Sequence, residues 1–318
     1  MPIRSTLGEI SSVKIWVTGG SGSLGQELIK KLELGNHGPI LLVPTRKELD
    51  LTNKNAVREY VASHKPTHVF HLAAKVFGIG GHKENPDASM LENTSIDFAV
   101  FSALLEYPPQ WVYYSSTVAA YGYPYQSLPL VEKDWLVGNP HASELGYSMS
   151  KREGLDYLEK LHTLFETKYV YGLCTNLFGS GDRFLEGRGH VIISLLEKAA
   201  KIYKSQVPLE VWGDGTASRD FLSTQAASTI LTDLMNKHVG IVNIASGLEL
   251  SIEEIADKIA IEFGILEGIK FIGINQGVTR RVCSIEKLNN YIDSTKIESP
   301  KDDLWREIAR YRTSQFAN

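Results

Sequence analysis

Cysteine is scarce in this chain of 318 residues, which contains only Cys174 and Cys283. Two cysteines are too few for a disulfide framework or a cysteine-rich zinc site, so we predict no metal centre and expect a reducing, cytoplasmic location. Long apolar runs are also missing, because no stretch reaches the roughly 20 residues that a helix needs to cross a bilayer. The amino end at residues 1–12 is polar, and we expect no association with a membrane.

An excess of charge of one sign is absent as well. The chain has 33 Lys and Arg against 37 Asp and Glu, a formal net charge of −4, and no block of like charges. Because no basic face is concentrated for a phosphate backbone, nucleic acid is not an expected partner. The 43% of hydrophobic residues excludes disorder, and without repeats or low-complexity linkers we expect one or two globular domains.

The first half of the chain alternates short apolar runs with helical patterns. The apolar runs lie at residues 13–18, 39–43, 67–72 and 110–115, and the helical patterns at 25–34, 55–64 and 88–105. Fully apolar strands separated by helices are typical of a parallel sheet that is covered on both faces and joined by right-handed crossovers. We therefore predict an α/β fold, a Rossmann-like doubly wound parallel sheet.

The pattern becomes less regular in the second half. Strands are predicted at residues 169–177, 209–212 and 240–245, and helices at 146–163, 191–204 and 251–263. Ser251 and Glu254 form a capping-box pattern at the start of the last of these helices. We predict a dinucleotide-binding domain over residues 1–172, to which segments near 215–250 return. A smaller mixed α/β substrate lobe is predicted over 173–318, at the carboxyl edge of the sheet.

A glycine-rich turn, residues 18–25, follows the first predicted strand. It reads as GxGxxG from Gly20 and as GxxGxxG from Gly19. Glycine allows unusual backbone angles, a close approach to a pyrophosphate and tight helix packing, and the amino end of the next helix attracts an anion. The predicted cofactor residues of this turn are Gly19, Gly22, Ser23, Leu24 and Gly25. The alternative is a tight strand-to-helix turn without a ligand.

The end of the second predicted strand lacks a carboxylate. Proteins that bind NAD usually place Asp or Glu there for the ribose hydroxyls, whereas this chain continues as Pro44-Thr45-Arg46-Lys47. The planar guanidinium of Arg46 suits a 2′-phosphate, which favours NADP (NADPH) as the cofactor. The alternative is that Arg46 is a solvated loop residue.

Tyr147 and Lys151 lie four residues apart in a predicted helix, which places them on one face. A phenol with a pKa near 10 transfers protons poorly at neutral pH, but a nearby lysine cation and an oxidised nicotinamide both favour its anion and lower that pKa. Tyr147 is therefore a candidate general acid or base. The hydroxyls of residues 115–117, at the end of a predicted strand, are candidates to polarise the same carbonyl. An exposed helix face is the alternative for this common spacing.

Together these motifs resemble the extended short-chain dehydrogenases that act on nucleotide sugars. The motifs are the glycine turn, Asp50-Leu51, His71-Leu72-Ala73-Ala74, the hydroxyl cluster at 115–117, and Tyr147 with Lys151. Within that superfamily the chain is most similar to the GDP-L-fucose synthase branch. The strings that carry this similarity lie at residues 65–69, 73–81, 175–179, 189–192, 211–215 and 219–221.

The resemblance implies an NADPH-dependent reduction of the 4-ketone of a GDP-linked 4-keto-6-deoxy sugar, either a hexose or a heptose. Tyr147 would protonate the C4 oxygen, Lys151 would hold the nicotinamide ribose, and Thr117 or Ser116 would supply the hydroxyl. The other cofactor contacts implied are Asp50, Leu51, Leu72, Ala73, Ala74 and Lys75. The nucleotide-sugar contacts implied are Asn176, His190, Val191, Lys198, Trp212 and Arg219. The alternatives of core packing for Trp212 and of a solvated helix face for Lys198 stay open. Members of the family commonly pair two subunits through their helices, which implies a homodimer.

One residue of this branch is missing. The family pairs the histidine at His190 with a cysteine just after the catalytic hydroxyl, and residues 117–119 contain none. His190 is therefore either a catalyst of 3,5-epimerisation or only a substrate contact. A 4,6-dehydratase is disfavoured because Val118 and Ala119 cannot replace its acidic pair. An epimerase that retains NAD(P), and a non-catalytic dinucleotide-sensing protein, remain the alternatives.

Overall fold

The computed structural model describes residues 13–34, 39–76, 86–179, 191–273 and 277–316. Among these residues, six parallel strands form a central sheet. From one edge to the other they are β2 (Ile40–Leu42), β1 (Lys14–Thr18), β3 (His68–His71), β4 (Trp111–Thr117), β5 (Lys168–Cys174) and β9 (Gly240–Ile244). The predicted doubly wound parallel sheet is confirmed.

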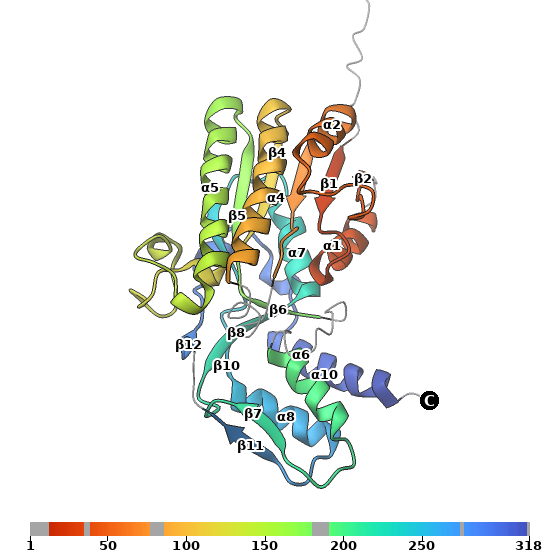
Figure 1. Ribbon diagram of the computed structural model, residues 1–318, viewed down its shortest axis with the longest axis vertical. Helices are drawn as coiled ribbons and strands as arrows, with labels where there is room; N and C mark the ends of the chain where they lie inside the picture. The colour runs from red at the N-terminus through yellow and green to blue at the C-terminus, as the bar shows by residue number, and fades with distance from the viewer. Residues whose placement is uncertain (1–12, 35–38, 77–85, 180–190, 274–276, 317–318) are drawn as a thin grey trace, which may run out of the picture.

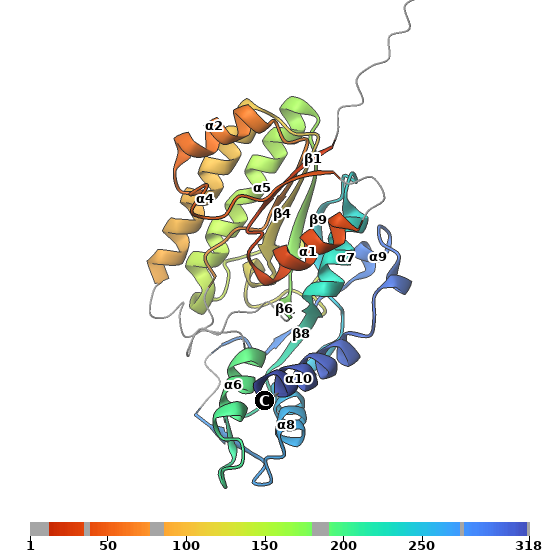
Figure 2. The ribbon, with the colours of Figure 1, turned by 90° about the vertical axis from the view of Figure 1, so that its right-hand side faces the viewer.

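Helices cover both faces of this sheet (Figure 2). One face carries α2 (Lys54–His64), α4 (Pro86–Glu106) and α5 (Leu145–Phe165), and the other carries α1 (Ser23–Glu33) and α7 (Thr224–Leu234). Alternate strand residues point to opposite faces. Tyr114 therefore packs into the core under α4 and α5, whereas its neighbour Tyr113 packs into the core under α7.

A smaller lobe lies below the central sheet in Figure 1. Its core is packed from the helices α6 (Val191–Lys201), α8 (Ile252–Phe263) and α10 (Pro300–Phe316). Its strands are β6 (Asn176–Phe178), β7 (Leu209–Trp212), β8 (Ser218–Ser223), β10 (Glu249–Ser251), β11 (Ile269–Ile272) and β12 (Arg280–Arg281). The predicted capping box is present on α8, since Ser251 and Glu254 each accept from the other's backbone N–H.

Short helical segments complete the described chain. They are α9 (Glu286–Asn289) and the 3-10 turns η1 (Val118–Ala120), η2 (Glu132–Asp134), η3 (Ala142–Glu144) and η4 (Ser294–Lys296). The turn η1 directly follows β4 and η3 directly precedes α5. Both therefore lie at the carboxyl edge of the sheet, next to the residues predicted to be catalytic.

The predicted strand at 169–177 is wrong as a single element. It divides at Thr175, because β5 ends at Cys174 in the central sheet and β6 begins at Asn176 and pairs with β8 of the smaller lobe. A continuous apolar run does not show that the chain changes sheets. The chain later returns to the central sheet through α7 and β9. The domain boundary at residue 172, with a return near 215–250, stays a prediction.

No helix in the described ranges is long and apolar enough to span a membrane. The same ranges contain no cluster of His, Cys, Asp and Glu able to hold a metal ion.

Candidate active site

The glycine turn brings three backbone segments into close contact. Gly19 has a φ of +72°, and a Cβ there would lie 2.8 Å from the backbone nitrogen of Ala73. A Cβ on Gly25 would lie 2.4 Å from the carbonyl oxygen of Gly19. Only glycine fits these positions without a shift of the backbone. The turn is therefore packed against the segment after β3 as well as against α1.

The amino end of α1 presents unpaired donors to this turn. Gly22 is its N-cap and contributes no side-chain hydrogen bond, and the first helical turn has no acidic residue. The first amide groups of a helix have no partner inside the helix. Ser23 adds a buried Oγ that has no hydrogen-bond partner within the described chain. This set of donors fits a pyrophosphate.

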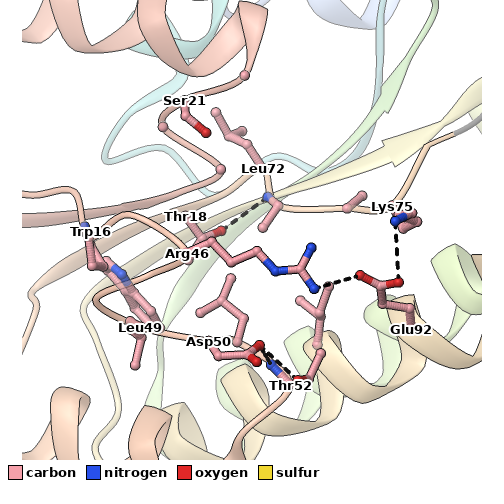
Figure 3. A pocket seen from close by; sticks show the side chains of 18 residues that line it. Trp16, Thr18, Ser21, Arg46, Leu49, Asp50, Thr52, Leu72, Lys75 and Glu92 are labelled. Carbon is pink, nitrogen blue, oxygen red and sulfur yellow. Dashed lines mark hydrogen bonds and ion pairs between the residues drawn. The ribbon is translucent and has the colours of Figure 1, made fainter. Parts of the chain in front are cut away.

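A cavity of about 310 Å³ opens beside the turn (Figure 3). The predicted cofactor residues that line it are Gly19, Gly22, Arg46, Asp50, Leu51, Leu72, Ala73, Ala74 and Lys75. Ser23, Leu24 and Gly25 instead form the first turn of α1. The cavity walls that sequence reasoning missed include Trp16 on β1 and Glu92 on α4. Neither belongs to a motif, because each reaches the cavity only through the packing of its element.

Charges of both signs meet at one side of the cavity (Figure 3). Arg46 Nη2 lies 3.4 Å from one oxygen of Glu92, and Lys75 Nζ lies 3.7 Å from the other. Asp50 accepts hydrogen bonds from the backbone and the hydroxyl of Thr52, which together lower its pKa. The Arg46 side chain is 73% exposed, so it can move toward a ligand at little cost.

Lys151 is buried in α5, with only 1% of its surface exposed. Its Nζ has no hydrogen-bond partner among the described residues and lies 4.6 Å from the centre of the Tyr114 ring. Burial lowers the pKa of Lys151, while the nearby Asp97 and Cys174 act in the opposite direction. A buried ammonium without hydrogen bonds fits a role in binding hydroxyl groups of a ligand.

Tyr147 is half-buried, one helical turn before Lys151. Burial raises the pKa of Tyr147, and the neighbouring Cys174, Glu144 and Asp97 raise it further. The Lys151 cation by itself does not bring this pKa below its ordinary value. The reason is that loss of hydration disfavours the phenolate more than any neighbouring cation favours it. The phenol therefore keeps its proton at neutral pH.

The two candidate hydroxyls at the end of β4 have different surroundings. Ser116 is buried, and its Oγ donates a hydrogen bond of 2.8 Å to Tyr171 Oη. Thr117 is half-buried, and its Oγ1 accepts from the backbone N–H of Ala119 at 3.1 Å. Because neighbouring strand residues face opposite ways, both side chains cannot serve one carbonyl. Thr117 is the more accessible of the two.

The substrate residues predicted on the smaller lobe fall on three of its elements. Lys198 of α6 lies with its Nζ 5.3 Å from the ring centre of Trp212, at the end of β7, and donates to the carbonyl oxygen of Glu210. Trp212 is 72% exposed, so core packing is wrong for this residue. Val191 is half-buried at the first position of α6. His190 and the residues at 78–81 lie outside the described residues.

The remaining two residues lie near the boundary of the lobes. Asn176 donates to the carbonyl oxygen of Asp220. The Arg219 guanidinium donates to the carbonyl oxygens of Ser218 and Val278, and burial together with the adjacent Arg281 lowers its pKa to about 10. Arg219, with the Arg281 guanidinium close by, stays a candidate contact for a diphosphate.

Arg281 is a candidate that sequence reasoning missed. Its guanidinium donates to Glu144 at 2.6 Å and to Tyr125 Oη at 2.8 Å. Glu144 directly precedes α5, so this ion pair links β12 to the helix that carries Tyr147. Burial acts to lower the pKa of Arg281, but Glu144 and Tyr125 raise it above its ordinary value. No motif marks Arg281 in the sequence.

The fold and the site define a Rossmann-like α/β protein with a Tyr-x-x-x-Lys pair at the carboxyl edge of its sheet, the class of the extended short-chain dehydrogenases. Residues 15–245 match the NAD dependent epimerase/dehydratase family. The chain belongs to this family.

Similar proteins share most of their length with this chain. A GDP-L-fucose synthase of Sinorhizobium fredii is 29% identical over 86% of this chain and 88% of its own length. A GDP-L-colitose synthase of Yersinia pseudotuberculosis is 26% identical over 78% of this chain and 81% of its own length.

Solved structures share the fold. A GDP-6-OMe-4-keto-L-xylo-heptose reductase from C. jejuni is similar with a TM-score of 0.85 and 21% identity, over 95% of this chain and 98% of that one. A GDP-mannoheptose C4 reductase from Campylobacter jejuni with NADP bound gives a TM-score of 0.83 at 20% identity, over 96% and 100% of the two chains.

Proposed function

We propose that this protein uses NADPH to reduce the 4-ketone of a GDP-linked 4-keto-6-deoxy sugar, a hexose or a heptose. The observation that carries the proposal is the buried, unpaired Nζ of Lys151 one helical turn from Tyr147, at the sheet edge where the glycine turn lies. The names of the relatives support the substrate class, because GDP-L-fucose synthase and GDP-L-colitose synthase are both named for GDP-sugars. The heptose C4 reductase with NADP bound supports the reaction and the cofactor.

The residues present fit NADP. The amide groups at the amino end of α1 and the Ser23 hydroxyl would bind the pyrophosphate, and Arg46 with Lys75 would bind the 2′-phosphate. Lys151 would donate hydrogen bonds to the nicotinamide ribose. NADPH supplies the hydride for C4 when it is bound.

The chain itself supplies the proton. Tyr147 is protonated at neutral pH because burial raises its pKa, so its O–H donates a proton to the C4 oxygen as that oxygen gains charge. The Thr117 hydroxyl donates a hydrogen bond to the same oxygen. The Lys151 ammonium then stabilises the phenolate that Tyr147 becomes. Hydride and proton together convert the ketone to an alcohol.

The diphosphate of the substrate would bind between the lobes. Arg219 and Arg281 provide two guanidiniums there, and Asn176 lies on the adjacent strand β6. The exposed ring of Trp212, with Lys198 beside it, would contact the nucleotide. His190 and Val191 would contact the sugar.

Residues 117–119 contain no cysteine to act as the second group of an epimerisation just after the candidate hydroxyl, where the branch has one. Cys174 is a poor substitute, since burial raises its pKa and its Sγ lies 3.2 Å from Tyr113 Oη. We therefore propose reduction without epimerisation at C3 and C5. Running the reaction in heavy water tests this point, and deuterium at both carbons would contradict it.

We also propose that the protein is a homodimer that pairs through α4 and α5. These two helices lie side by side (Figure 1), and they expose Leu91, Phe98, Met149 and Leu164. Exposed apolar side chains on two adjacent helices are typical of a helical interface. Sedimentation at several protein concentrations would distinguish this dimer from a monomer.

The reductase proposal is tested by mixing the protein with NADPH and GDP-4-keto-6-deoxy-mannose and following the absorbance of the reduced nicotinamide. Tyr147→Phe should lower kcat by roughly 10²- to 10⁴-fold, because it removes the proton donor and keeps the ring. A panel of GDP-, UDP- and dTDP-linked keto-sugars defines the substrate. If none of the GDP-linked keto-sugars leads to oxidation of NADPH, the proposal is overturned.

A further inference from the structure

A chain of buried polar contacts runs beneath Lys151. Thr18 Oγ1 on β1 lies 2.6 Å from His71 Nδ1 on β3, and His71 Nε2 lies 2.9 Å from Asp97 Oδ1 on α4. Tyr114 Oη on β4 donates to the other oxygen, Asp97 Oδ2, at 2.5 Å. All four side chains and Lys151 are at most 2% exposed. Four separate elements therefore contribute to one continuous network under the catalytic helix.

The donors in this network have a defined order. The backbone N–H of Ala73 donates to Thr18 Oγ1, which leaves the Thr18 proton for His71 Nδ1. His71 then carries its proton on Nε2 and donates it to Asp97, an assignment that follows from the partners. Asp97 thus accepts a hydrogen bond on each oxygen, which favours the ionised carboxylate.

Lys151 is the cation that faces this carboxylate. Burial acts to raise the pKa of Asp97, but the charge of Lys151 and the hydrogen bond from His71 bring it below its ordinary value. The Tyr114 ring contacts both charged groups, since its face is 4.6 Å from Lys151 Nζ and its hydroxyl donates to Asp97. A ring whose hydroxyl donates to a carboxylate is a stronger acceptor for a cation on its face.

Other titratable groups around Lys151 do not replace Asp97. Those on the elements packed against it are His71 on β3, Tyr114 on β4, Tyr147 on α5, and Tyr171 and Cys174 on β5. Burial raises the pKa of the three tyrosines and of Cys174, so these groups are neutral at neutral pH. In the described chain, Asp97 is the anion that acts on Lys151 at neutral pH.

We propose that Asp97 is a positioning residue for catalysis, which holds the Lys151 ammonium charged and in place over the Tyr114 ring. Asp97 lies under the helix and acts on the reaction only through Lys151. Its effect on turnover rests on the proposed reductase function. Its effect on the ionisation of Lys151 does not, so the two are tested separately.

The first test measures the pKa of Lys151 in the free protein, by NMR of lysines labelled with carbon-13 at the ε position. A Lys151→Arg variant identifies the signal by its loss. Wild-type Lys151 should be charged at pH 7 although it is fully buried. Asp97→Asn should lower its pKa by about 1 to 3 units, because loss of a nearby opposite charge typically has an effect of that size.

Tyr114→Phe is the matched control. It removes one hydrogen bond to Asp97 but keeps the carboxylate and the ring, so the pKa of Lys151 should fall by less than in Asp97→Asn. A wild-type Lys151 that is neutral at pH 7 would overturn the proposal, and this result does not depend on whether any variant folds. A folded Asp97→Asn protein with an unchanged Lys151 pKa would also overturn it.

The second test is the pH dependence of kcat for NADPH oxidation. In Asp97→Asn the alkaline loss of activity should move to lower pH, and the deficit should shrink as the pH falls, because protons then restore the Lys151 charge. Each unit by which the pKa lies below the assay pH lowers the charged fraction about tenfold. A deficit equal at every pH would indicate a structural role only. If wild type has no reductase activity, the NMR measurement still decides the proposal.

Discussion

Replacing Arg46 by Ala should weaken NADPH binding and leave NADH binding nearly unchanged. The proposed partner of Arg46 is the 2′-phosphate, which only NADPH carries. In the free protein the guanidinium lies 3.4 Å from Glu92 and is 73% exposed, so releasing that pair costs about 0 to 1 kcal/mol. A hydrogen bond to a charged group contributes about 1.5 to 3 kcal/mol. The net loss in Arg46→Ala is then about 0.5 to 3 kcal/mol, or roughly a 2- to 150-fold rise in Kd.

Titrations of both nucleotides against both proteins, followed by the fluorescence of the reduced nicotinamide, measure this difference. Lys47→Ala is the matched control, because it removes one neighbouring positive charge from a residue that does not line the cavity. Its effect on NADPH should be several-fold smaller. Glu92→Gln should act in the opposite direction and tighten NADPH, since it releases both Arg46 and Lys75. Equal losses for NADPH and NADH in Arg46→Ala would refute the cofactor assignment.

Three further outcomes are expected. Thr117→Ala should lower kcat by roughly 10²-fold, because it removes a hydrogen-bond donor to the C4 oxygen. Ser116→Ala should instead lower the free energy of unfolding by about 1 kcal/mol and leave kcat nearly unchanged. Steady-state kinetics and urea unfolding measure the two effects, and an exchange of the effects between the variants would contradict the assignment. Gly25→Ala should raise the Kd for NADPH at least tenfold, because its Cβ would lie 2.4 Å from the Gly19 carbonyl oxygen. Unchanged NADPH binding in titrations would argue against this close contact between Gly25 and Gly19. Burial raises the pKa of Asp220 to about 6, above its ordinary value, so its proton is held more tightly in the folded chain. The free energy of unfolding of the wild type should therefore fall by about 2 kcal/mol relative to that of Asp220→Asn between pH 4 and pH 7, and two pH profiles that stay parallel over this range would disprove the prediction.

The parts of the fold that rest on local pattern were predictable from the sequence. The apolar run at 13–18 became β1, and the capping box at Ser251 begins α8 as expected. Parallel pairing followed from strands that are apolar on both faces. The change of sheet at Thr175 was not predictable, because no glycine or proline marks it at residues 173–178 and only the partner strands differ.

The candidate site was predictable to the extent that its residues form motifs of fixed spacing. Gly19, Arg46 and Lys75 line one cavity because each follows a strand whose carboxyl end lies at the same edge of the sheet. Glu92 and Arg281 carry no such signal. Glu92 reaches the cavity from the middle of a helix, and Arg281 reaches Glu144 across the boundary between the lobes.

The direction of the Tyr147 pKa shows why spacing alone does not determine chemistry. Four residues of separation place Lys151 near the phenol, and from charge alone its pKa should fall. The structure adds burial, which raises the pKa of Tyr147 and lowers that of Lys151. Burial favours the neutral form of both groups, so the phenol is retained as a donor while the ammonium needs a compensating anion. Asp97 supplies that anion from another helix, and a proton donor next to a cation is the state in which reduction of a ketone begins.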